Sequence, residues 1–134
     1  MSQEDIEVVR SIYAAWERGD FTSAEWAHPE IEYVSADGPA PGRATGLAGM
    51  AESFRDWLSA WEEWRVEAEE YRELGGGRVL VLFHFSARGK TSGLRVGQIW
   101  TKGASLFHVH DGKVTKLVQY FERAKAFEAV GPRE

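Results

Sequence analysis

The first part of the chain carries apolar side chains at helical spacing. They recur every three or four residues, which predicts an amphipathic helix over about residues 3–18. The members of this stripe are Ile6, Val9, Ile12, Tyr13 and Trp16. Gly19 and Asp20 stop the pattern, and the segment FTSAEWA predicts a shorter helix over residues 21–27 that ends before Pro29.

A third helical stripe begins after a segment rich in turn-forming residues. Residues 35–46 combine glycine and proline in the run SADGPAPGRATG, which predicts a surface loop. The stripe that follows predicts a helix over about residues 47–61. Its members are Leu47, Met50, Phe54, Trp57, Leu58 and Trp61.

Alternating apolar and polar residues replace the helical period elsewhere. The run EIEYV predicts a first strand over residues 30–34, and the second half of the chain predicts a meander of four longer strands. These strands are expected at 64–74, 78–88, 94–110 and 113–122, before a tail helix at 123–131. Helices first and an antiparallel meander second indicate an α+β fold.

Composition narrows the function. The 134 residues carry a net charge of −5, fit one globular domain over residues 1–134, and include six Trp, seven Phe and four Tyr. The basic residues of the last third are scattered along predicted strands, which argues against nucleic-acid binding. The chain has no cysteine, an acidic start and no apolar run long enough for a membrane. We therefore expect a cytoplasmic protein without a signal peptide or membrane contact.

The stretch FHVHDGK at residues 107–113 raises the question of a metal site, because His108 and His110 are one residue apart. Strand alternation puts Phe107 and Val109 in the core and the two histidines on the other face. Asp111 and Gly112 are typical of a type I′ hairpin turn. The third outer-face ligand would have to be His84. We interpret the stretch as a hairpin and expect no bound metal and no cofactor.

The order of these elements resembles the SnoaL-like branch of the NTF2-like superfamily, which includes the ketosteroid isomerases. The resemblance covers nearly the whole chain and is carried by five stretches. They are IYAAWERGDF (12–21), HPEIEYV (28–34), residues 46–82, GKTSG (89–93) and residues 107–131. It implies a cone-shaped, curved and mostly antiparallel sheet, wrapped by the three helices of the N-terminal half, around a deep apolar pocket. Many members are homodimers, and their functions vary widely.

The resemblance also implies positions for the chemistry of the isomerases. The carboxylate base on their first strand falls at Tyr33, and the tyrosine of their first helix falls at Ile12. Their protonated acid, which is also the catalytic acid of the polyketide cyclases, falls at Ser105. A phenol is a poor base at pH 7 and a serine needs an activating neighbour, although both can form hydrogen bonds. The isomerase route is therefore not expected here.

Two further polar residues are candidates for the same pocket. Gln119 shares the inward parity of Leu117 and Phe121 on the last strand. Glu70 alternates with Val66, so it could point inward, where burial would raise its pKa and suit it to acid–base work. The alternative for Glu70 is that a bulge turns it to solvent.

These residues leave two functions open. In the first, an apolar pocket binds an aromatic or carbonyl-bearing molecule, with Tyr33, Ser105 and Glu70 as candidate catalytic groups for isomerase, cyclase or hydratase chemistry. Gln119 would contact the ligand and the remaining walls would be apolar. The walls are Trp16, Trp57, Trp61, Val81, Phe83, Phe85, Phe107, Val109, Leu117 and Phe121. In the second, a non-catalytic dimeric module binds a ligand or another protein and its interior is filled by side chains.

A homodimer is expected in either case. The outer face of the sheet mixes apolar, aromatic and polar groups, as interfaces do. The residues expected near the interface are Leu82, His84, Gln98, Trp100, His108 and His110.

Overall fold

The computed structural model describes residues 2–20, 25–36, 42–59, 61–89 and 99–130. Within these ranges, the side chains of 2, 3, 57, 58, 61–64, 87–89 and 99–101 are not described. The elements are α1 (Ser2–Glu17), β1 (Ala27–Ser35), β2 (Gly42–Thr45), α2 (Gly46–Ser59), β3 (Trp61–Gly75), β4 (Arg78–Gly89), β5 (Ile99–His110), β6 (Lys113–Tyr120) and α3 (Arg123–Val130).

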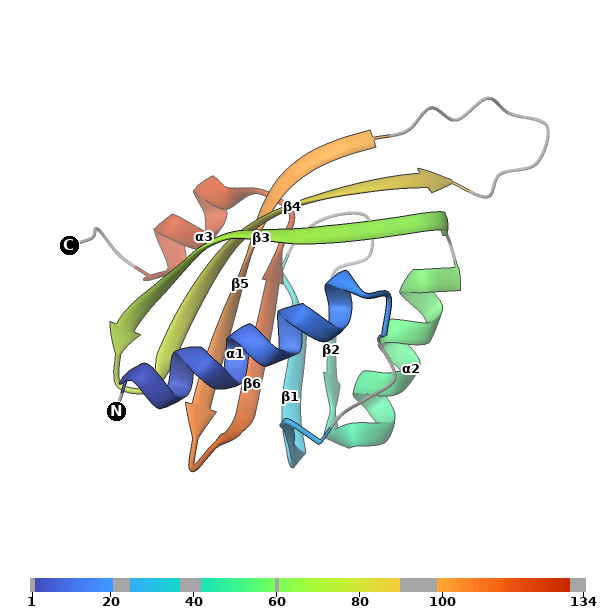
Figure 1. Cartoon of the computed structure of the whole chain (residues 1–134). Helices are drawn as coiled ribbons and strands as arrows, with labels where there is room; N and C mark the ends of the chain where they lie inside the picture. The colour runs from blue at the N-terminus through green and yellow to red at the C-terminus, as the bar shows by residue number, and fades with distance from the viewer. Residues whose placement is uncertain (1, 21–24, 37–41, 60, 90–98, 131–134) are drawn as a thin grey trace.

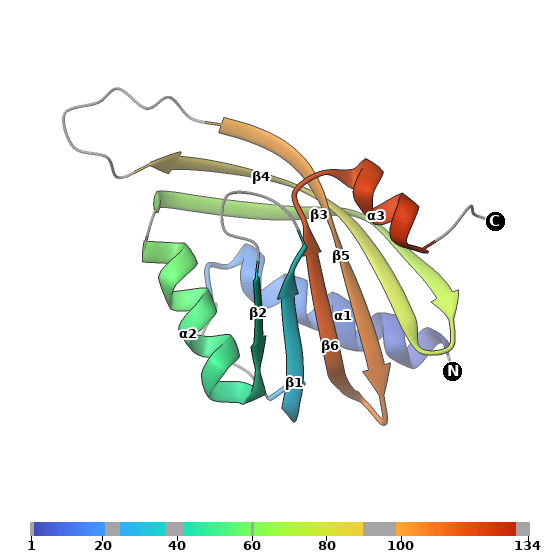
Figure 2. The ribbon, with the colours of Figure 1, turned by 180° about the vertical axis from the view of Figure 1, so that it is seen from behind.

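The six strands form one curved sheet in the order β2-β1-β6-β5-β4-β3 (Figure 1). All neighbours pair antiparallel except β1 and β6, which are parallel. Helix α1 crosses one face of this sheet, α3 lies on the opposite face, and α2 flanks β1 and β2 (Figure 2). The expected α+β architecture with a mostly antiparallel, curved sheet is confirmed.

The helices differ from expectation in one place. Among the described residues of the segment expected as a second helix, Glu25 and Trp26 form a turn and Ala27 begins β1. The N–H of Val114 on β6 donates to the carbonyl of Trp26 at 2.8 Å, so sheet pairing overrides the local helical pattern. Residues 21–24 lie outside the described part. The described helices are therefore two in the N-terminal half and one near the C-terminus.

The first strand is longer than EIEYV and tolerates a proline. Its ladder to β6 shifts register between Ala27 and Glu32. Pro29 lies inside this irregular stretch, where a missing N–H costs no regular ladder bond. The predicted loop also contains a short strand, since β2 pairs with β1 through Tyr33 and Ala44.

The turns between the long strands follow their sequences. Asp111 and Gly112 both have positive φ, at 52° and 77°, as the predicted type I′ turn requires. Gly77 has φ of 80°, and a Cβ there would meet the carbonyl oxygen of Val109 at 2.4 Å. The N–H of Val109 in turn donates to the carbonyl of Gly77 at 2.7 Å. The close approach of the two hairpins therefore requires glycine at 77.

The sheet has a hydrophobic core on each face. The inner core lies between the sheet, α1 and α2 and includes Val9, Ile12, Tyr13, Trp16, Ile31, Tyr33, Met50, Val81, Phe85, Phe107 and Leu117. The outer core lies under α3 and includes Leu80, Leu82, Ala104, Leu106, Val118, Tyr120 and Ala126. Among the described residues, no helix is long and apolar enough to span a membrane.

Candidate functional site

Ser105 is a polar residue at the centre of the inner core. Its exposed fraction is 0%. Alternation on β5 directs it to the same face as Phe107, which is also fully buried. On the two neighbouring strands it stands opposite Val81 of β4 and Gln119 of β6. The sequence predicted this inward direction for both Ser105 and Gln119, and the structure brings the two side chains together.

A chain of side-chain hydrogen bonds passes through Ser105. The hydroxyl of Tyr13 on α1 donates to Ser105 Oγ at 2.9 Å, and Ser105 Oγ donates to Gln119 Oε1. Gln119 also forms a side-chain hydrogen bond with Tyr33 on β1, which is bonded to Ser35 as well. We refer to Tyr13, Ser105, Gln119 and Tyr33 as the inner polar chain. Its members come from one helix and three adjacent strands.

Both phenols of the inner polar chain are held in the neutral form. Burial raises the pKa of Tyr13 well above its ordinary value of 10.0, with Tyr71, Tyr33 and Glu17 adding to it against the hydrogen bond to Ser105. Burial likewise raises the pKa of Tyr33 to about 12, against the hydrogen bonds with Gln119 and Ser35. Neither phenol is a base at pH 7. What these groups offer is neutral hydrogen bonding in an apolar medium.

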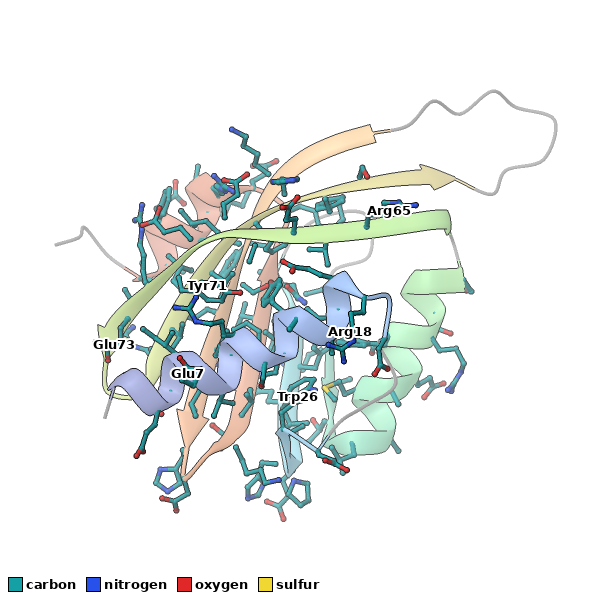
Figure 3. The ribbon with its side chains drawn as sticks, viewed as in Figure 1. Glu7, Arg18, Trp26, Arg65, Tyr71 and Glu73 are labelled. Atoms are coloured by element: carbon teal, nitrogen blue, oxygen red, sulfur yellow. The ribbon has the colours of Figure 1, made fainter. Side chains whose placement is uncertain are left out.

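Aromatic rings surround the chain. The ring of Tyr13 lies edge-on to Trp16 at a centroid distance of 4.9 Å and to Phe107 at 6.0 Å. Phe83 is also 6.0 Å away, and Phe54 packs edge-on against Tyr33 at 5.2 Å. Such rings favour flat, uncharged contacts. A second aromatic contact joins Trp16 to Trp26, which Figure 3 shows below α1, at 6.1 Å.

The apolar residues predicted to line the interior are buried where the structure describes them, except Phe121, which is partly buried. Val81, Phe107 and Leu117 are 0% exposed, and the other members belong to the same core or pack against it. These others are Trp16, Phe83, Phe85, Val109 and Phe121. The side chains of Trp57 and Trp61 lie outside the described part, so their predicted role stays a prediction.

Of the two directions considered for Glu70, the inward one, which made it a candidate catalytic group, is wrong, and the alternative of a bulge that turns it to solvent holds. The β3–β4 register shifts between Ala68 and Glu70, which is a β-bulge, and the bulge reverses the alternation of β3. Glu70 is exposed and pairs with Arg72 at 2.7 Å. Tyr71 takes the inward place instead, between β3 and α1 in Figure 3, with its ring 6.3 Å from that of Tyr13. A carboxylate at 70 therefore contributes nothing to the interior.

Tyr13 is the site residue that sequence reasoning missed. The family resemblance placed the helix tyrosine at Ile12, and the structure buries both residues at 1% exposure. The hydroxyl that reaches Ser105 belongs to Tyr13, one position further along the helix. The available signal was the helical stripe, which already placed Tyr13 on the same buried face as Val9 and Trp16.

The histidines lie on the other face of the sheet, as strand alternation predicted. His108 is half-buried, and its pKa is lowered by burial and by the nearby charges of Lys116 and Arg78. His110 is exposed at the hairpin tip beside Asp111. The two ring nitrogens of His84 face different carboxylates, Glu69 at 2.7 Å and Glu67 at 3.2 Å. No group of three or more potential metal ligands gathers within the described ranges.

The residues predicted near a dimer interface have mixed positions. Leu82 is only 4% exposed, because it belongs to the outer core that α3 covers. His84 pairs with carboxylates of β3, and His108 and His110 lie toward the hairpin tip. Gln98 and the side chain of Trp100 lie outside the described part. The prediction of a homodimer is unaffected by these positions and stays a prediction.

Comparison with known proteins identifies the family to which this fold belongs. The family model of the SnoaL-like domain matches residues 9–117. No curated protein matches the chain in sequence at a significant level.

Several solved structures share the fold. TerC, co-crystallised with polyporic acid, is 23% identical, with a TM-score of 0.75 over 95% of this chain and 98% of its own. An NTF2-like protein of unknown function from Burkholderia pseudomallei is 18% identical, with a TM-score of 0.76 over 96% and 98%. A protein of Jannaschia sp. described as a SnoaL-like polyketide cyclase is 12% identical, with a TM-score of 0.76 over 99% and 95%. At these identities the likeness extends to the fold.

Proposed function

The chain belongs to the SnoaL-like domain family, and we propose that it binds a small, neutral, aromatic or carbonyl-bearing molecule in its interior through the inner polar chain. The ligand would occupy the space between α1 and the inner face of the sheet, against Trp16, Phe83 and Phe107. Ser105, Gln119 and the two tyrosines would orient it by hydrogen bonds.

The observation that carries this proposal is the neutrality of the buried polar chain. Three consecutive links join Tyr13, Ser105, Gln119 and Tyr33, with no ionised member. Buried polar groups cost free energy unless they are paired. A core built only for stability would use apolar residues here, so a chain of hydroxyl and amide groups favours a recognition role.

The same neutrality limits the chemistry. Among the described residues, the inner polar chain includes no carboxylate, and Tyr33 holds its proton far above pH 7. Any turnover would therefore proceed by hydrogen-bond polarisation of a carbonyl or hydroxyl, as a cyclisation or hydration could, rather than by carboxylate-mediated proton abstraction. We expect that the wild type does not isomerise a 3-keto-Δ5 steroid. The absorbance of the conjugated product measures this reaction. Efficient turnover would contradict this limit.

The solved relatives are consistent with a small-molecule role. TerC was crystallised with polyporic acid, and the Jannaschia protein is described as a polyketide cyclase. These descriptions apply to TerC and to the Jannaschia protein themselves. They support the choice of flat, oxygenated, carbon-rich compounds as the first ligands to try.

The direct test is equilibrium dialysis of the protein against neutral naphthalene-type probes, together with mass spectrometry of small molecules that co-purify with it. Burial of about 300 Å² of ligand at ~25 cal/mol per Å² gives at most about 7.5 kcal/mol before the cost of association, so micromolar affinity is the upper limit that we expect. Gln119→Leu should weaken binding about fivefold, since it removes one hydrogen bond. Ser86→Ala is the control. Ser86 is also a buried polar residue, but it lies on the outer face of the sheet, away from the inner polar chain.

The second candidate, a non-catalytic dimeric module, is favoured by the tight filling of the interior. Tyr13 and Phe107 at its centre are 1% and 0% exposed. In this alternative the protein binds no probe and remains a homodimer through the outer sheet face. Light scattering at micromolar concentration together with dialysis separates the two candidates. Absence of binding by every probe would reject the first.

A further inference from the structure

The inner polar chain has a fixed direction. The Oε1 atom of Gln119 has no proton, so the hydrogen between it and Ser105 belongs to the serine. A serine hydroxyl has one proton, which is now used. The hydrogen between Tyr13 and Ser105 must therefore come from Tyr13, as the 2.9 Å contact is oriented. All protons in this part of the chain point from the helix toward β6.

This direction leaves an acceptor at the start of the chain. The proton of Tyr13 is committed to Ser105, and its Oη keeps lone pairs that receive no donor from the described residues. Tyr13 is 1% exposed, and the described groups near it are aromatic rings, the phenols of Tyr33 and Tyr71 and the carboxylate of Glu17. Among the described residues, the hydrogen bond that Tyr13 Oη forms is the one to Ser105. The hydroxyl of Tyr13 is satisfied by its bond to Ser105, and its lone pairs can accept a second hydrogen bond from a ligand.

The lone pairs of Tyr13 Oη select for a hydrogen-bond donor. An oxygen that donates into a hydrogen-bond chain becomes a stronger acceptor, so Tyr13 Oη favours an incoming O–H. A ligand carbonyl can be served only if Tyr13 turns its proton away from Ser105, which breaks the chain. A charged group would have to be desolvated among aromatic rings without a counter-ion.

We propose that the interior site selects neutral ligands that carry a hydroxyl group, a phenol or an enol, and that this hydroxyl donates to Tyr13 Oη. This inference rests on the proposed function and names the ligand class of the same site. Tyr13 then acts as the residue that distinguishes hydroxyl-bearing ligands from the corresponding ethers and ketones.

Three naphthalene probes of nearly equal size test the selection by equilibrium dialysis at pH 7. They are 2-naphthol, 2-methoxynaphthalene and 2-acetonaphthone. We expect the naphthol to bind roughly fivefold more tightly than the ether, as one net hydrogen bond predicts. In Tyr13→Phe this advantage should disappear while the ether binds as before. A thermal melt establishes that the variant is folded.

Ser105→Ala gives the sharper result. Loss of the Ser105 hydroxyl leaves the proton of Tyr13 without its acceptor, so the phenol can donate to a ligand carbonyl. We expect the ketone to gain affinity relative to the naphthol, by about fivefold, in a variant that deletes a polar group. Equal binding of all three probes to the wild type, or a ketone preference in it, would overturn the hydroxyl selection and leave the proposed function standing. No binding of any probe would remove the proposed function itself.

Discussion

Two polar clusters lie on opposite faces of the same sheet and differ in charge. On the outer face, Arg123 at the start of α3 donates to Glu69 at 2.8 Å, and Glu69 also contacts His84 at 2.7 Å. We refer to Arg123, Glu69 and His84 as the outer charged cluster. On the inner face, the chain of Tyr13, Ser105, Gln119 and Tyr33 contains only neutral groups.

The outer charged cluster has a structural explanation. Besides Glu69, Arg123 donates to the backbone carbonyls of Phe83 at 2.8 Å and Gly103 at 3.0 Å. Phe83 and Gly103 are cross-strand partners, and the bulge of β3 lies opposite Phe83. A Cβ at Gly103 would meet the carbonyl of Tyr120 at 2.6 Å. Arg123 thus satisfies carbonyls where the sheet is irregular and fixes α3 over the outer core.

The inner polar chain satisfies no backbone group in this way. Each of its links joins one side chain to another. Replacing paired polar groups with apolar ones of similar shape can leave stability almost unchanged. The difference teaches that polar clusters on the two faces of one sheet can serve different ends, the partly exposed outer one as an anchor of α3 and the buried inner one as our proposed ligand site. The outer cluster holds the fold together, and the inner chain calls for an explanation in terms of a ligand.

The largest expected effect is therefore on the outer face. Arg123→Ala should lower the free energy of unfolding by about 2–3 kcal/mol, because it removes three hydrogen bonds, two to backbone carbonyls and one to Glu69, which keeps only His84. Urea denaturation followed by circular dichroism measures it. Lys125→Ala, an exposed cation on the same helix, is the control. A loss no larger than that of the control would show that Arg123 does not anchor α3.

Alkaline pH should reveal the burial of the inner phenols. The pKa of Tyr33 is about 12 in the folded protein and 10.0 as its ordinary value, so between these values the unfolded chain loses a proton that the folded chain retains. Stability from this group is complete below pH 10 and falls by about 1.4 kcal/mol per pH unit as pH rises toward 12. Tyr33→Phe should show a shallower fall. Identical slopes for wild type and variant would contradict the burial of this hydroxyl.

The smallest expected effect is on the melting temperature at acidic pH. The pKa of Glu69 is lowered by hydrogen bonds from Arg123 and His84, so its contribution to stability is present above pH 4.5 and is lost as pH falls below it. Glu69→Gln should reduce the acid sensitivity of the melting temperature. Glu70→Gln is the matched control on the adjacent residue. A larger change in the control would place the important carboxylate at 70 and not at 69.

The sequence predicted the parts that depend on local periodicity. Helix α1, the type I′ turn at Asp111–Gly112 and the inward direction of Ser105 follow from spacing and alternation. It failed where pairing between distant segments decides. Ala27 is extended because β6 pairs with that segment, and Glu70 is exposed because a bulge shifts β3. The local pattern favoured a helix at Ala27, and for Glu70 it left both directions open.

The candidate site was predicted in its strands and missed in its helix. The inward direction of Ser105 and Gln119 follows from strand parity, which has only two outcomes, and Tyr33 came from the family resemblance. On α1, Ile12 and Tyr13 are both buried, and their difference in direction depends on how the helix is rotated against the sheet. Because that rotation is set by packing, the sequence alone could not choose the residue that meets Ser105.

The most direct test of a ligand role compares the affinity of 2-naphthol for the wild type and for the variant Tyr13→Phe, Ser105→Ala, Gln119→Leu, Tyr33→Phe, which replaces the whole inner polar chain. The affinity is measured by equilibrium dialysis on protein whose unfolding free energy is known. We expect the variant to unfold within about 1 kcal/mol of the wild type and to bind at least roughly tenfold more weakly. Unchanged affinity in a folded variant, or a loss of several kcal/mol in stability, would contradict the assignment of the inner polar chain to a ligand.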